Sequence, residues 1–192
     1  MAQETTLNRD QEARLLAMAR GAIARALRVG AAEVAGTDDP AFAAKGAAFV
    51  TLTKGGRLRG CIGSLRAVES LADSVRGNAV SAALHDPRFA PLSAAELAEV
   101  RIEISVLSEP EPLPYNDPAE LLAILNRERP GLILSDAAGH RATFLPQVWE
   151  QLPRAEDFLA ALCRKAGLSA GAWKTEALRY QRYSVHHFEE PA

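Results

Sequence analysis

Apolar residues return every three or four positions in several stretches of the chain, which is the spacing of a helix with one buried face. The first stretch follows Asn8 and Gln11, whose separation is that of a capping box, and predicts a helix over residues 9–28. Ser93 and Glu96 have the same separation and predict a short helix. The periodicity predicts three further helices, over residues 68–84, 117–126 and 156–166. Asp117 is the expected N-cap of the second of these, and Gly167 is the expected C-terminal cap of the third.

Apolar and polar residues alternate elsewhere, and this alternation is typical of half-buried strands. Residues 49–53 and 57–62 are predicted to form a hairpin whose turn is residues 54–56. The alternation of residues 100–106 predicts another strand, whereas residues 146–153 are predicted to be irregular. Two more extended regions are predicted: a hairpin with its turn between Ser135 and Arg141, and a late strand within residues 176–188.

The order of these elements indicates the fold class. Hairpin-connected strands from distant parts of the chain, interleaved with helices, favour an α+β fold with a mostly antiparallel sheet over a doubly wound parallel sheet. The proline-rich residues 108–118 are the best candidate for a connection between two lobes. We therefore expect one domain over residues 8–188, built from two closely packed lobes.

Composition excludes several functional classes. The chain has 192 residues, 48% of them hydrophobic, and a net charge of -2, which gives no basic field for nucleic acid. The N-terminus has no signal pattern, and no apolar run approaches the roughly 20 residues of a membrane helix. We expect a cytoplasmic protein without membrane attachment. A local cluster of arginines is a weak nucleic-acid signal and consists of Arg57, Arg59, Arg66 and Arg76.

The stretch GRLRGCIGSL, residues 56–65, concentrates glycine, arginine and one of the two cysteines. It does not match a phosphate-binding loop, because its glycines lie in a predicted hairpin and not between a strand and a helix. Taken singly, Gly60 and Gly63 are explained by a close approach of another backbone or by a bulge. Beside a nucleophile, they would also let a substrate approach.

Cys61 is the candidate nucleophile of this stretch. Alternation places Leu58, Gly60 and Ile62 on one face of the strand and Arg59, Cys61 and Gly63 on the other. An arginine on the same face would favour the thiolate form. The alternative is an inert cysteine in an apolar core.

The loop HDPRFAPL supplies candidate partners for Cys61. His85 is the candidate base, and its alternative is a solvated loop histidine. Asp86 and Arg88 form either an Asx turn with a surface ion pair or a polar wall facing the LRGCIG motif. The candidate binding residues are therefore Leu58, Gly60, Ile62, Gly63, Asp86 and Arg88.

The remaining reactive or aromatic residues give weaker signals. Cys163 lies among apolar residues of a predicted helix and is expected in a core, and the two cysteines have no metal-ligand spacing. His186 and His187 have no third ligand at a characteristic spacing, so no metal and no cofactor is predicted. Trp149 and Trp173 are expected to anchor the lobes or to line a cavity.

Several blocks of the sequence together resemble the AMMECR family. The blocks contain LRGCIG at residues 58–63, DPRF at 86–89, LPQV at 145–148, and KAGL at 165–168 followed by Trp173. They occur in this order and cover nearly the whole chain beyond the first predicted helix. All six positions of LRGCIG match the family motif.

The resemblance implies an α+β fold of two unequal lobes that face each other across a groove, with the LRGCIG hairpin as the suspected functional site. It also implies a genomic association with a Memo-like protein and a radical SAM enzyme. From this we expect an enzyme or enzyme component that uses Cys61 on an unidentified small molecule. The alternatives are a non-catalytic partner module for either associated protein and, third, a nucleic-acid-linked regulator.

Overall fold

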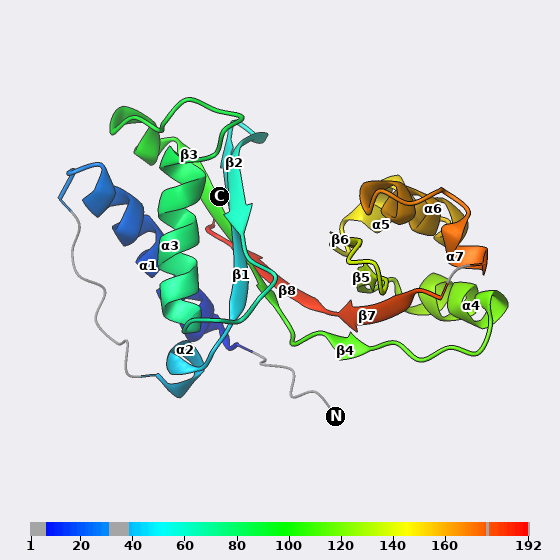
Figure 1. The fold of residues 1–192 in the computed structure, drawn as a ribbon. Coiled ribbons are helices and arrows are strands. Elements are labelled where there is room, and N and C mark those ends of the chain that lie inside the picture. The colour runs from blue at the N-terminus through cyan, green and yellow to red at the C-terminus, as the bar shows by residue number, and fades with distance from the viewer. Residues whose placement is uncertain (1–6, 31–38, 176, 192) are drawn as a thin grey trace. The chain divides into compact units, whose positions relative to one another are not determined.

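The computed structural model describes residues 7–30, 39–175 and 177–191 and divides into two compact units (Figure 1). The first unit contains the chain up to Ser108 and again from His186, and the second unit is Glu109–Val185. The chain therefore passes between the units twice. Two predictions fall partly outside the described residues. The N-terminus that was expected to lack a signal pattern includes residues 1–6, and the predicted late strand includes Glu176, and none of these residues is described. The groove between lobes stays a prediction.

The helices of the first unit begin at side-chain caps. Helix α1 is Arg9–Ala26, and the predicted capping box is confirmed, since Asn8 and Gln11 each accept a hydrogen bond from the other's backbone amide. Asp39 caps α2, Pro40–Ala43, and Ser70 caps α3, Leu71–Leu84. The predicted capping box of Ser93 and Glu96 is also present, but the helix that follows, η1 (Ala95–Ala98), is a short 3-10 helix.

The first unit has a four-stranded sheet in the order β2-β1-β3-β8. Its strands are β1 (Ala47–Lys54), β2 (Arg57–Gly63), β3 (Val100–Leu107) and β8 (Val185–Glu189). Strand β1 pairs antiparallel with both β2 and β3, and α1 and α3 cover one face of the sheet (Figure 1). The apolar residues of that face, such as Val50, Leu52 and Ile104, are fully buried against the two helices.

The second unit has its own antiparallel sheet and its own core. The strand order is β4-β7-β5-β6. The strands are β4 (Glu111–Pro112), β5 (Gly131–Ser135), β6 (Arg141–Phe144) and β7 (Arg179–Tyr183). The helices are α4 (Pro118–Glu128), α5 (Val148–Gln151), α6 (Ala155–Lys165) and α7 (Ala172–Thr175). Leu134 and Tyr180 on the sheet join Leu125 and Phe158 on the helices in one buried cluster. The mixed helical and antiparallel architecture confirms the predicted α+β class.

Two predictions of secondary structure are wrong. Residues 146–153, predicted to be irregular, contain the helix α5, because Trp149 is buried and its ring stacks on Phe158. The single late strand predicted within residues 176–188 is two strands, β7 and β8, which separate at Ser184 and belong to different sheets. The predicted C-terminal cap is confirmed, because Gly167 follows α6 with φ +83°.

Candidate functional site

The candidate site begins with the turn of the β1–β2 hairpin. Gly55 and Gly56 have φ of +57° and +73°, so both adopt the left-handed conformation that a two-residue hairpin turn requires. Lys54 pairs with Arg57 across this turn. The turn therefore contains only the two glycines, one residue fewer than predicted.

A β-bulge follows the turn and changes the direction of the motif's side chains. Leu52 pairs with Gly60, whereas the next residue, Thr53, pairs with Leu58, so Arg59 is an extra residue on β2. Such an extra residue lies on the same side as its successor, which here is Gly60 on the face toward α3. The prediction that Arg59 and Cys61 share a face is wrong, because simple alternation does not anticipate a bulge.

The same bulge corrects the prediction for Leu58. Leu58 pairs with Thr53, which lies on the sheet face opposite the buried Leu52, so Leu58 does not share a face with Gly60 and Ile62. Ile62 does pack against the core of the first unit, as alternation predicts. Leu58 instead remains 45% exposed.

Arg59 is held by Glu96 and Phe89. Its Nε and Nη2 atoms each donate a hydrogen bond of 3.2 Å to the Glu96 carboxylate, and its guanidinium lies 5.9 Å from the centre of the Phe89 ring. These hydrogen bonds are the main reason that the pKa of Glu96 is lowered to about 2. The Nη1 atom of Arg59 is buried and has no hydrogen-bond partner among the described residues. The Arg59 guanidinium is therefore bound to the Glu96 carboxylate.

Cys61 lies on the opposite face of β2 and is partly exposed. The hydroxyl of Thr51, its cross-strand neighbour on β1, donates a hydrogen bond of 3.3 Å to the Cys61 sulfur. The alternative of a fully buried, inert cysteine does not describe Cys61.

Asp86 and Arg88 hold the backbone of Cys61 at the free edge of β2. The Cys61 amide donates to Asp86 Oδ2 at 2.9 Å, and Arg88 Nη2 donates to the Cys61 carbonyl at 3.2 Å. Arg88 also forms two hydrogen bonds with the Asp86 carboxylate, of 2.9 and 2.7 Å. The two residues thus occupy the place of a neighbouring strand, and they join DPRF to LRGCIG. We call this arrangement the Asp86–Arg88 clasp.

The clasp also determines the charge beside Cys61. The Asp86 side chain is 1% exposed, and the hydrogen bonds from Arg88 and from the Cys61 amide hold its pKa well below the usual value. The pKa of Arg88 is raised, mainly by its hydrogen bond to Asp86 and in smaller part by attraction to a Cys61 thiolate. Arg88 is therefore the cation that contacts the Cys61 backbone. The loop forms the Asx turn, in which the Arg88 amide donates to Asp86 Oδ1, and it also contacts the LRGCIG motif through Cys61.

The two motif glycines permit close packing. A Cβ atom at Gly60 would collide with the carbonyl oxygen of Ala82 in α3, and one at Gly63 would collide with the ring of Phe49. Both contacts agree with the structural explanation of these glycines. Because the Cys61 amide is bound to Asp86, it is not free to stabilise an oxyanion.

His85 is not brought into contact with Cys61 by any hydrogen bond. It ends α3, its backbone amide donates to the Ser81 carbonyl, and its exposed ring makes no hydrogen bond with any residue that the structure describes. The solvated loop histidine is thus the interpretation that the geometry favours.

The other predicted candidates lie elsewhere. Cys163 is fully buried in the second unit, and both tryptophans belong to the same core. His186 pairs with Glu12 at 2.7 Å, and within the described ranges no group of three or more His, Cys, Asp or Glu side chains is placed to hold a metal. Of the arginine cluster, Arg59 and Arg76 are paired with carboxylates.

Reasoning from the sequence missed two contributors to the site. Thr51 was assigned only to a strand, although its register opposite Cys61 follows from a two-residue turn once the bulge is known. Glu96 was assigned only to a capping box, and its carboxylate accepts hydrogen bonds both from the Ser93 amide and from Arg59. No signal in the sequence links Glu96 to Arg59, because 37 residues separate them.

The part of the chain that the structure describes contains no helix that is both long and apolar enough to span a bilayer.

Comparison with known proteins identifies the family. A family model described as AMMECR1 matches residues 16–188. A protein of Methanothermobacter thermautotrophicus is 38% identical over 191 residues, which cover 96% of each chain. Protein SSO0193 of Saccharolobus solfataricus is 35% identical over 199 residues, which cover 99% of this chain and 86% of that protein. The crystal structure of the uncharacterized protein PH0010 from Pyrococcus horikoshii matches with a TM-score of 0.77 at 32% identity, covering 92% of this chain and 89% of that one. The chain therefore belongs to the AMMECR1 family.

Proposed function

We propose that this protein is an enzyme or enzyme component that uses Cys61 as a nucleophilic thiol toward a small molecule. The observation that carries the proposal is the combination of a partly exposed Cys61 and a backbone whose amide and carbonyl are both bound by the Asp86–Arg88 clasp. A fixed backbone keeps the thiol in one orientation, and exposure gives an electrophile access to it.

The charge that favours the thiolate comes from Arg88 in this proposal. Arg88 is about half exposed and contacts the Cys61 carbonyl, whereas Arg59 is bound to Glu96 on the other face of the sheet. The Thr51 hydroxyl adds a hydrogen bond to the sulfur. The role expected of Arg59 therefore passes to Arg88 in this proposal. His85 is no longer the base, and a base for the reaction would come from the substrate or solvent.

The test is the rate of alkylation of Cys61 by iodoacetamide, measured by mass spectrometry of the intact chain at several pH values. The thiolate sulfur displaces iodide from carbon, so the rate follows the fraction of thiolate. Cys163 is an internal control, because it is fully buried and should not react in the folded protein. Cys61→Ser should abolish the modification.

Two arginine variants separate the proposed role of Arg88 from that of Arg59. Arg88→Gln should slow alkylation at neutral pH by about 3- to 10-fold, because a cation beside the thiolate is lost. Arg59→Gln should leave the rate within about twofold of the unmodified protein, since its charge is neutralised by Glu96. A Cys61 that reacts no faster than free cysteine, or an equal effect of both variants, would contradict the proposal.

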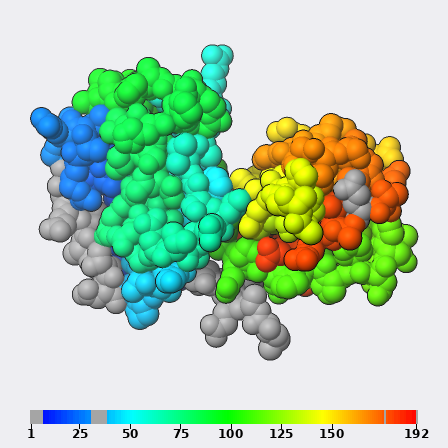
Figure 2. All heavy atoms as spheres, in the orientation of Figure 1, coloured from blue at the N-terminus to red at the C-terminus, as the bar shows by residue number. Residues whose placement is uncertain are grey.

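A second candidate is a partner module for a Memo-like protein or a radical SAM enzyme. It is favoured by Leu58, which is 45% exposed near the tip of the β1–β2 hairpin. Figure 2 shows this cyan tip projecting from the surface of its unit. For this candidate, Leu58→Ser should abolish co-purification with either protein while Cys61→Ser retains it. The reverse pattern would favour the nucleophile.

A further inference from the structure

A row of polar side chains crosses the sheet of the second unit. Ser135 at the end of β5 pairs with Arg141 on β6 and with Arg179 on β7, so the three residues lie side by side on one face. Leu134 and its partners Ala142 and Tyr180 lie on the other face, which the core cluster of the unit covers. The Arg141–Ser135–Arg179 row therefore lies on the face away from that core.

The side chains of this row have no polar partners among the described residues. Across the ranges that the structure describes, neither arginine forms a hydrogen bond or an ion pair, and the Ser135 hydroxyl forms no hydrogen bond. Arg182 on the same strand β7 differs, because it is bound to both Glu111 and Glu128. The nearest carboxylate in sequence, Asp136, is bound to His140 at 2.7 Å. The row thus carries two positive charges that no carboxylate of the described residues pairs with.

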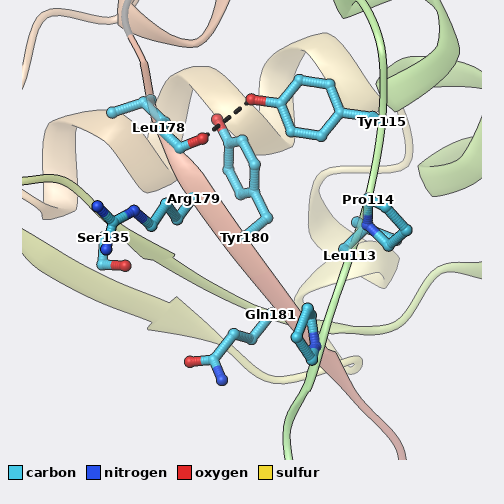
Figure 3. Close-up of a pocket in the computed structure, with 9 residues that line it drawn as sticks. Leu113, Pro114, Tyr115, Ser135, Leu178, Arg179, Tyr180 and Gln181 are labelled. Carbon is cyan, nitrogen blue, oxygen red and sulfur yellow. Dashed lines mark hydrogen bonds between the residues drawn. The ribbon is translucent and has the colours of Figure 1, made fainter.

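Two members of the row, Ser135 and Arg179, line a cavity of about 500 Å³, and Arg141 is the cross-strand neighbour of Ser135 outside that lining. The volume is within the range of small-molecule sites. Figure 3 shows Ser135 and Arg179 at one end and Leu113, Pro114 and Tyr115 along the other side. Gln181, which is two residues after Arg179, contributes an amide that has no hydrogen-bond partner among the described residues. The Tyr115 hydroxyl is occupied, since it donates to the Leu178 carbonyl at 3.0 Å.

The lining determines the kind of ligand. Guanidinium, hydroxyl and amide groups can all donate hydrogen bonds to an oxyanion, and none of the residues that line the cavity carries a carboxylate for a cation. The prolines and Tyr115 offer flat apolar surfaces to a ring. One end of the cavity therefore matches an anionic group, and its wall matches an apolar body.

We propose that this cavity binds a small organic anion that carries an aromatic ring, with its carboxylate or phosphate on the Arg141–Ser135–Arg179 row and its ring on the wall of Pro112, Pro114 and Tyr115. The site lies entirely within the second unit and does not depend on Cys61. It goes beyond the proposed function, so failure of either proposal leaves the other intact.

The test is titration of the isotope-labelled full chain, followed by the backbone amide signals in two-dimensional NMR spectra. Benzoate and phenyl phosphate are the anionic probes, benzamide is the neutral analogue, and acetate is the anion without a ring. Benzoate or phenyl phosphate should shift the signals of Leu113, Arg179 and Gln181 with saturation in the millimolar range, roughly as expected for a fragment. Benzamide and acetate should each bind about 10-fold more weakly.

Three arginine variants make the test specific. Arg179→Gln and Arg141→Gln should each weaken benzoate binding by about 10-fold, because a charged hydrogen-bond donor is lost. Arg164→Gln removes the same charge from an exposed position on α6 and should leave binding unchanged. The side chains are exposed, and the unaltered spectrum of each variant will show that it folds. Absence of saturable shifts, equal binding of benzamide, or equal binding by the Arg179 and Arg164 variants would overturn the proposal.

Discussion

Two tyrosines of the second unit differ in how their hydroxyls are satisfied. The Tyr180 side chain is buried, and its hydroxyl has no hydrogen-bond partner among the described residues. The Tyr183 hydroxyl is within 3.0 Å of both Thr143 Oγ1 and the Phe144 carbonyl. Burial raises the pKa of both phenols, that of Tyr183 to about 12. The neutral hydroxyl is therefore the form that both residues hold near neutral pH.

This difference predicts opposite effects of removing the hydroxyl. Tyr180→Phe should leave the free energy of unfolding unchanged or raise it by up to about 1 kcal/mol, because an unsatisfied buried polar group is removed. Tyr183→Phe should lower it by about 1–2 kcal/mol, because the hydrogen bond that the Tyr183 hydroxyl donates to the Phe144 carbonyl is lost. Urea unfolding measures both. If Tyr180→Phe costs as much as Tyr183→Phe, then the Tyr180 hydroxyl has a partner in solution.

Single residues were predicted best where their role is local. Asn8, Asp117 and Gly167 cap helices as expected, since a cap involves residues only a few positions apart. The partners of Arg59 and Cys61 were not predicted, because Glu96 and Asp86 are distant in sequence. The type of a residue determines which contacts its side chain can make. It does not determine which of these contacts forms in the folded protein.

At the scale of whole elements, the contact between strand β2 and helix α3 depends on Gly60. Gly60 lies against the backbone of α3, where a Cβ atom would meet the Ala82 carbonyl, whereas Gly77 within α3 has no atom within 4 Å of such a Cβ. Of these two glycines, Gly60 has a packing reason to be glycine and Gly77 does not. Glycine costs a helix interior about 0.5–1 kcal/mol relative to alanine.

The two glycines therefore predict stability changes of opposite sign. Gly60→Ala should destabilise the protein by about 1–3 kcal/mol through overpacking of β2 against α3. Gly77→Ala should stabilise it by about 0.5–1 kcal/mol. Thermal and urea unfolding followed by circular dichroism would show both changes. A neutral Gly60→Ala would mean that β2 can move away from α3 without loss.

Elements were predicted well where periodicity extends over many residues. The long helix α1 and the strands β1 to β3 follow their apolar patterns, whereas the short helices α2, α5 and α7 have too few residues to show a period. The bulge at Arg59 was missed for the same reason, since one inserted residue leaves no mark in a seven-residue strand.

The ion pair between Arg59 and Glu96 links sequence-distant parts of the first unit, and its effect depends on pH. The pKa of Glu96 is about 2 in the folded protein and is ordinarily 4.5. Because the folded pKa is the lower one, the stabilisation is complete above pH 4.5 and is lost as the pH falls toward 2. The pKa of Asp86 is also lowered in the folded protein, so its contribution to stability is likewise lost as the pH falls.

Glu96→Gln should therefore make stability less dependent on pH across this acid range. The variant should be less stable than the unmodified protein at neutral pH, and the difference should shrink on acidification. The urea midpoint at a series of pH values measures this. Glu69→Gln alters an exposed carboxylate that forms no ion pair with the described residues, and it should leave the acid profile unchanged. An acid profile of Glu96→Gln that parallels the unmodified protein would contradict the assignment.

At the scale of the whole molecule, the sequence by itself determined the α+β class, the helix caps, the glycine turn and the family resemblance, because these depend on neighbouring residues or on ordered motifs. The tertiary structure alone decided that Arg88 and not Arg59 lies beside Cys61, and that residues 177–189 divide between two sheets. It also brought Arg141 and Arg179 to either side of Ser135. These features depend on strand register and on contacts between distant segments, which form only when the chain packs.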